Sequence, residues 1–65
     1  MIPVIGAYVQ DTLGHWYQVL EVQAEGWRYT VDPVYVSHNS ETGAIRFNSY
    51  GWGHVVIGRS ELRIQ

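Results

Sequence analysis

The stretch "NSYGWGHVV", residues 48–56, places two large aromatic side chains, Tyr50 and Trp52, next to glycines. The face of an aromatic ring attracts cations and stacks on planar groups. Glycine-rich segments are usually loops, and loops carry a large share of the binding residues of proteins. Two interpretations follow: the rings fold back to close a core, or they stay partly exposed and recognise a ligand.

All four positive charges of the chain are arginines, and three of them lie in its second half. Arg46, Arg59 and Arg63 are candidates for contacts with phosphate groups, while Tyr50 and Trp52 would stack on bases. The net charge of the chain is −2, whereas a nonspecific nucleic-acid binder needs a dense basic face. The composition therefore favours a mixed, solvated surface, and nucleic-acid contact stays an alternative.

The other reactive side chains do not favour a metal or catalytic site. His15, His38 and His54 lack the spacing of a metal site, even with Asp11 added, and the chain has no cysteine. The serines lie in turns or at strand ends, with no nucleophile-elbow sequence around them. We therefore expect no enzyme, no metal and no cofactor.

The length limits the chain to one domain, residues 1–65. A domain of this size buries about 60% of its unfolded surface and is marginally stable unless disulfides, metals or partners help. Three Trp, five Tyr and one Phe supply packing area instead. "MIPVIGAYV" is apolar but lacks a charged leader and stops at Gln10, so we expect no signal peptide and no membrane span. An intracellular protein is expected, cytoplasmic or, in a eukaryote, nuclear.

Alternation of apolar and polar residues, rather than a helical period, predicts strands along most of the chain. The expected strands are residues 4–10, 15–22, 27–32, 34–38, 44–49, 54–58 and 62–64. In "WRYTVD" the alternation places Trp27 and Tyr29 on the buried face. Pro33 cannot donate to a ladder and indicates an edge, a bend or a strand boundary, and "RSEL" (59–62) predicts one 3₁₀ turn. A meander this short buries its apolar face by curling into a small barrel.

Two stretches together resemble a Tudor domain, a five-stranded SH3-like barrel. "DTLGHWYQVLEV" is similar to the family's Asp/Gly turn and the aromatic-Tyr pair that starts its second strand. "IRFNSYGWGHVVIGRSELRI" is similar to its hydrophobic-x-aromatic-x-x-Tyr-Gly segment, polar turn and last strand. The resemblance covers residues 5–22 and 45–64, and residues 23–44 have no equivalent. It implies an all-β, five- to six-stranded antiparallel SH3-like (Tudor-like) barrel with a 3₁₀ turn before the last strand.

Tudor domains bind methylated lysine or arginine in an aromatic cage, where ring faces attract the cation. The resemblance places three walls of such a cage at Tyr17, Phe47 and Tyr50. The fourth wall falls at Gln10, which is not aromatic. Trp52 occupies a position that is usually polar in the family, and Trp52 or Tyr8 is a candidate for the missing wall.

The expected function is a non-catalytic binding module with a rim made of Tyr17, Phe47, Tyr50 and Trp52. It would recognise a protein or peptide partner, including one with a methylated or otherwise cationic side chain. The alternatives are a nucleic-acid or ribonucleoprotein contact protein that uses Arg46, Arg59 and Arg63, and a phage- or plasmid-encoded accessory or inhibitor protein. A homo-oligomer that forms through the apolar segment "VYVS" (34–37) is compatible with each of them.

Overall fold

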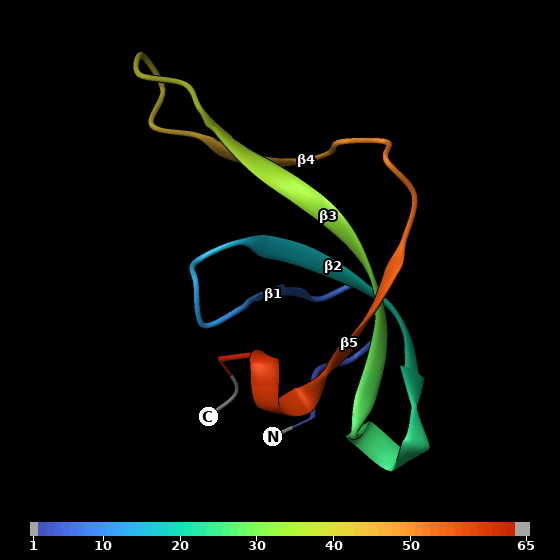
Figure 1. Ribbon diagram of the computed structural model, residues 1–65. Helices are drawn as coiled ribbons and strands as arrows, with labels where there is room; N and C mark the ends of the chain where they lie inside the picture. The colour runs from blue at the N-terminus through green and yellow to red at the C-terminus, as the bar shows by residue number, and fades with distance from the viewer. Residues whose placement is uncertain (1, 64–65) are drawn as a thin grey trace.

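In a computed structural model, which describes residues 2–63, five antiparallel strands form a single sheet (Figure 1). They are β1 (Tyr8–Gln10), β2 (Trp16–Gln23), β3 (Arg28–His38), β4 (Ile45–Ser49) and β5 (Val55–Gly58). The order in the sheet is β1-β2-β3-β4, and β5 also pairs with β3. Two 3₁₀ turns, η1 (Ala24–Gly26) and η2 (Arg59–Glu61), accompany them. The predicted all-β antiparallel class is confirmed, and η2 lies where "RSEL" predicts a 3₁₀ turn.

Among residues 2–63 the structure contains no helix that is long and apolar enough to cross a membrane.

The hydrophobic core lies on the face of the sheet where β2, β3 and β5 meet. Val19 and Val31 are cross-strand partners and are fully buried. Tyr29, as predicted, is also fully buried, and its cross-strand partner is Ile57. Cross-strand partners share a face, so the register alone collects the alternate apolar residues into one layer. Leu62 completes this cluster after η2.

The sequence predicts that Trp27 is buried beside Tyr29, and this prediction is wrong. The side chain of Trp27 is 68% exposed. The backbone at Trp27 is helical, with φ −88° and ψ −19°, and its N–H donates to the C=O of Ala24 at 3.1 Å. The alternation of strand β3 therefore begins one residue later, at Arg28.

Strand β3 runs through Pro33, where the sequence predicts a boundary. The C=O of Pro33 accepts a hydrogen bond from the N–H of Tyr50 at 3.2 Å. The nitrogen of Pro33 lies on the same side of the strand, facing residues 50–54. These residues, here called the bulge, leave the ladder: β4 pairs with residues 34–38 of β3, and β5 pairs with residues 28–31. A proline fits inside a strand where no neighbour needs its N–H.

The first strand is shorter than predicted, because residues 4–7 form a turn in which the N–H of Ala7 donates to the C=O of Val4 at 3.0 Å. At the other end of the chain, Asp11 and Leu62 form one isolated bridge. Within residues 2–63 no ladder closes the sheet into a barrel. The predicted last strand, 62–64, extends beyond the described residues.

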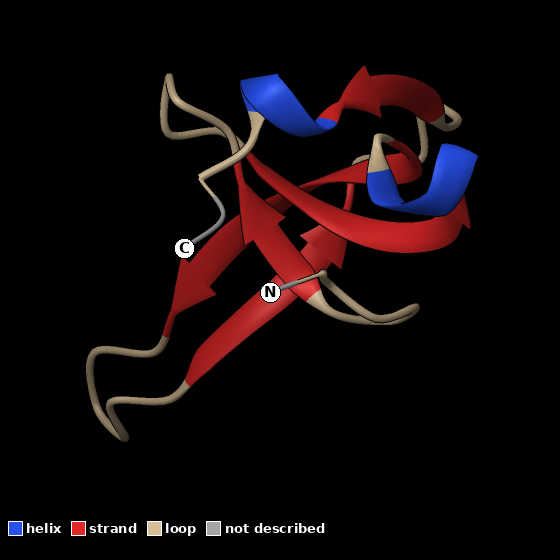
Figure 2. Cartoon of the chain, turned by 90° about the horizontal axis from the view of Figure 1, so that it is seen from below, coloured by secondary structure: helices blue, strands red, loops and turns tan. Residues whose placement is uncertain are grey.

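The ends of β3 and β4 extend beyond the rest of the sheet and form a projecting hairpin. Val34 pairs with Trp16 of β2, but residues 35–38 pair only with β4. Residues 35–48, here called the arm, point away from the two 3₁₀ turns in both views (Figure 1, Figure 2). The segment "VYVS" has β4 on one side throughout. On its other side only Val34 is paired, with Trp16, so residues 35–37 keep an open edge there.

Candidate functional site

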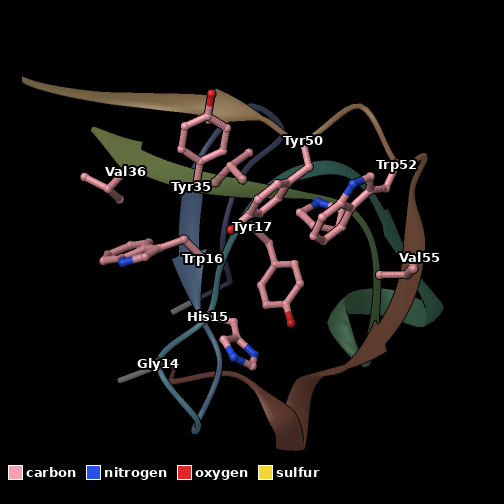
Figure 3. A pocket seen from close by; sticks show the side chains of 11 residues that line it. Gly14, His15, Trp16, Tyr17, Tyr35, Val36, Tyr50, Trp52 and Val55 are labelled. Atoms are coloured by element: carbon pink, nitrogen blue, oxygen red, sulfur yellow. The ribbon is translucent and has the colours of Figure 1, made fainter. Parts of the chain in front are cut away.

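A groove of about 590 Å³ opens on the sheet next to the bulge (Figure 3). Its lining is mostly apolar and aromatic, and the side chains that matter for the argument are Tyr17, Pro33, Tyr35, Tyr50, Trp52 and Val55. Tyr50 lies between Tyr17 and Trp52 in Figure 3, with Val55 to the right and Trp16 and Val36 to the left. A concave surface of this kind, with few polar groups, is typical of a ligand site.

Three of these rings form a continuous stack, here called the Tyr50 stack. The rings of Tyr50 and Trp52 are parallel, with centroids 3.9 Å apart and an interplanar angle of 11°. Tyr35 packs on the other side of Tyr50, at 4.9 Å and 47°. Trp52 is nevertheless 75% exposed, and Tyr35 and Tyr50 are each 44% exposed. The rings support one another but are not covered by the rest of the chain.

The backbone of the bulge explains how the rings of Tyr50 and Trp52, which are two positions apart in the sequence, come to stack. Gly51 and Gly53 have φ values of +73° and +96°, a region that residues with a side chain rarely adopt. The N–H of Gly51 donates to the Oγ of Ser49 at 3.0 Å, and the N–H of Tyr50 is bonded to Pro33. The glycines therefore fold the chain so that the side chains of Tyr50 and Trp52 point the same way.

Tyr17 lines the groove with its ring and directs its hydroxyl to a buried carboxylate. The hydroxyl donates to Asp11 Oδ2 at 2.8 Å. Burial and this hydrogen bond raise the pKa of Tyr17 to about 12, because both disfavour the phenolate. The phenol is thus neutral at all physiological pH values, and its ring has a fixed orientation in the groove.

Asp11 holds the turn between β1 and β2 in place. Its Oδ1 accepts hydrogen bonds from the N–H groups of Leu13 and His15, each at 2.9 Å. The Nδ1 of His15 lies 3.4 Å from Asp11 Oδ2, while the imidazole is largely exposed at the rim of the groove. Burial alone would raise the pKa of Asp11, but the hydrogen bonds from Tyr17 and from the two amides outweigh it, and the pKa is lowered.

The predicted four-walled cage is not assembled, because Phe47 lies on the opposite face of the sheet from Tyr17 and Tyr50. Its ring stacks on Tyr8 at 4.0 Å and meets Trp16 edge-on at 5.2 Å; these three rings are here called the Phe47 cluster. In the ladder Phe47 pairs with Val36, whereas Tyr17 pairs with Pro33. Positions 33 and 36 of one strand point to opposite faces.

The two candidates for the fourth wall also lie in different places. Tyr8 belongs to the Phe47 cluster, whereas Trp52 is in the groove. The amide of Gln10 is bonded to the C=O of Gly14 at 3.0 Å. The structure therefore brings Tyr17, Tyr50 and Trp52 together and separates Phe47 and Tyr8 from them.

Sequence reasoning missed Pro33, Tyr35 and Val55 as lining residues. A signal was present for two of them: Pro33 and Tyr35 are two positions apart, so they share a face in any strand that contains both. Interpreting Pro33 as a boundary hid this signal. Val55 lines the groove because β5 resumes pairing with Val31 directly after the bulge.

The three arginines proposed for nucleic-acid contact do not line the groove. The Cζ of Arg59 lies 5.7 Å above the ring of Trp27. Arg63 donates to the side chain of Gln10 at 3.4 Å, and Arg46 lies on the arm. The basic groups are thus spread over the molecule, and the exposed ring that Arg59 contacts, Trp27, lies outside the groove.

The histidines are also separate: His15 precedes β2, His38 ends β3 and His54 precedes β5. In the described part of the chain no three potential metal ligands gather at one place.

Comparison of the chain with models of protein families, with curated proteins and with solved structures gives no significant match. The functional interpretation therefore depends on the geometry of the groove.

Proposed function

We propose that the chain is a non-catalytic binding module whose groove takes up an extended peptide segment of a protein partner. The observation that carries the proposal is Trp52, whose ring is 75% exposed but is held in the Tyr50 stack. Trp and Tyr dominate the energetics of protein interfaces, because they bury a large area at a small loss of conformational freedom. A ring that already has a fixed position loses still less conformational freedom when a ligand covers it.

The geometry supports an apolar or planar ligand group better than a caged cation. The rings of Tyr50 and Trp52 are 3.9 Å apart, so nothing fits between them. The outer face of Trp52 is the surface that remains for a proline ring, an aromatic side chain or a methylated cation. None of the residues that line the groove is a carboxylate, so a cationic N–H donor on the ligand would find no opposite charge among them.

The SH3-like (Tudor-like) barrel is part of the same proposal. In such a barrel a 3₁₀ turn precedes the last strand, which then pairs with the first. Two features support it: η2 lies directly before Leu62, and the Asp11–Leu62 bridge brings the end of the chain to β1. The N–H of Arg63 also donates to the C=O of Gln10 at 2.8 Å, next to this bridge.

Two exposed tryptophans provide a matched pair of variants for testing the groove. Trp52 lines it, whereas Trp27, 68% exposed, does not. An array of proline-rich, aromatic and trimethyl-lysine peptides would be titrated against both variants. We expect Trp52→Ala to weaken binding of the peptide class that the wild type selects by about tenfold or more, and Trp27→Ala to leave it unchanged.

Equal losses in both variants, or full binding by Trp52→Ala, would contradict the groove as the site. An RNA oligonucleotide that binds with a steep salt dependence would instead favour the nucleic-acid alternative.

A further inference from the structure

The arm is a two-stranded ribbon with no third strand beside it, in the part of the chain that the structure describes. Its strands pair only with each other over residues 35–38 and 45–48. Its turn is well bonded: the side chain of Asn39 accepts from the N–H groups of Glu41 and Thr42 at 2.9 and 3.2 Å. A two-stranded hairpin alone is marginal in water. Phe47 anchors the arm to Tyr8 and Trp16, while the outer edge of β4 stays open to further pairing.

Two hydrogen bonds at the ends of the arm show which backbone groups of β4 face outward. The N–H of Asn39 donates to the C=O of Ala44, and that of Tyr50 donates to the C=O of Pro33. Hydrogen-bonded pairs alternate along an antiparallel ladder, so the register makes Arg46 and Asn48 the bonded residues of β4. The N–H and C=O groups of Ile45, Phe47 and Ser49 therefore point away from β3, toward the open edge.

This outward set is symmetric about Phe47, which suits a second copy of the same strand. An antiparallel strand related by a two-fold axis at Phe47 would place Phe47 opposite Phe47, and Ile45 opposite Ser49 of the second copy. These are the residues whose backbone groups point outward in both copies. Arg46 would then face Asn48 of the second copy, so no like charges oppose each other.

The side chains of the arm support the same partner. Ile45 and Val36 are 66% and 41% exposed and lie on the face that carries Phe47. The opposite face carries Tyr35 and, beyond it, the polar residues Ser37, Arg46 and Asn48, with Asn48 bonded to the Oγ of Ser37 at 3.1 Å. Strand β4 carries one charged side chain, Arg46, but no lysine and no proline, and its pairing with β3 is regular over residues 45–49. Pairing of two copies would join their apolar faces into one surface.

We propose that two copies of this chain associate edge to edge through β4, around a two-fold axis at Phe47, and form one continuous sheet. The pairing strand is separate from the groove, since none of residues 45–49 lines it, although Val36 of the adjoining apolar face does. The sequence predicts self-association through "VYVS", whereas the proposal places it at β4, the strand that pairs with this segment.

The register gives a test that charge alone can decide. Asn48→Asp would place two opposite-charge pairs across the axis, because Arg46 of each copy would face the introduced carboxylate of the other copy. Asn48→Arg would instead place two like-charge pairs there. Both variants lose the same hydrogen bonds of the Asn48 side chain. Sedimentation equilibrium of the full chain, 7.5 kDa as a monomer, would measure the dissociation constant of each variant.

We expect Asn48→Asp to tighten the dimer and Asn48→Arg to weaken it, each by about threefold to tenfold. The double variant Arg46→Glu/Asn48→Arg restores opposite charges across the axis and should return to at least wild-type affinity. Far-UV spectra of diluted samples would check that each variant is folded. A wild type that stays at 7.5 kDa up to millimolar concentration, or a shift of both single variants in the same direction, would overturn the proposal.

Discussion

The Phe47 cluster and the Tyr50 stack each hold three aromatic rings at similar spacing, but they differ in the elements that they connect. The Phe47 cluster joins β1, β2 and β4, and Phe47 and Trp16 are half-buried in it. The Tyr50 stack joins one strand to its neighbouring bulge, and all three rings are more than 40% exposed. Rings that meet from distant parts of the chain hold the fold together, whereas rings that meet locally leave their outer faces free.

The largest difference in stability between the two groups is expected when one ring of each is replaced by alanine. These rings are Phe47 at the centre of the Phe47 cluster and Trp52 at the outer end of the Tyr50 stack. Phe47→Ala removes the ring that touches both Tyr8 and Trp16, and should lower the free energy of unfolding by about 2–3 kcal/mol. Trp52→Ala removes a ring that is mostly in solvent, and should change it by less than about 0.5 kcal/mol. Urea unfolding at several protein concentrations measures both values. Similar losses in the two variants would contradict the division into structural and exposed rings.

A second effect concerns the carboxylate that anchors Tyr17 beside the exposed stack. The pKa of Asp11 is lower in the folded than in the unfolded chain, so its contribution to stability is present above about pH 4. This contribution is lost as the pH falls through the pKa that Asp11 has in the folded chain. Asp11→Asn should be less stable by about 1–3 kcal/mol at neutral pH, and its stability should fall less between pH 5 and pH 2. If the stability of the variant falls as much as that of the wild type between pH 5 and pH 2, this role of Asp11 is ruled out.

The smallest effect compares the hydroxyls of two tyrosines, the half-buried Tyr17 and the fully buried Tyr29. Tyr17→Phe removes a donor from Asp11 and should lower stability by about 1 kcal/mol. Tyr29→Phe should be neutral within about 0.5 kcal/mol or slightly stabilising, because the Tyr29 hydroxyl has no partner among the described residues. Thermal unfolding of both variants distinguishes them.

A spectroscopic titration adds a direct measure of the Tyr17 hydroxyl. The pKa of Tyr17 is about 12 against an ordinary value of 10.0, so the stability that its neutral form contributes is lost between about pH 10 and pH 12. The Tyr17→Phe variant should lack the phenol that ionises near pH 12 in the wild type.

The sequence predicts the strands well where alternation is regular, and less well where a turn residue has two interpretations. "WRYTVD" predicts the burial of Tyr29 correctly, because the partner strands continue their alternation. The same pattern is wrong for Trp27, because η1 extends into it. Pro33 suggests a boundary, yet the strand continues because the bulge lies opposite. This compensation depends on the tertiary structure, so a local sequence pattern does not predict it.

The candidate site could be predicted only in part for a similar reason. The glycines around Tyr50 and Trp52 indicate exposed rings, and the structure places both in the groove. The family motif groups Phe47 with them, although position 47 lies on the other face of the ladder. The face depends on the register of β4 against β3, which is set by the turn at residues 39–44 rather than by the aromatic residues.

The bulge lies between two ladders that are each fixed separately, β4 by residues 34–38 and β5 by residues 28–31 of the same strand. A change in the length or composition of residues 50–54 therefore has no reason to shift either register. The chain can thus exchange the side chains it presents to a partner while its scaffold stays the same. Libraries randomised at these five positions should yield folded proteins with new specificities, much as hypervariable loops do on an antibody framework.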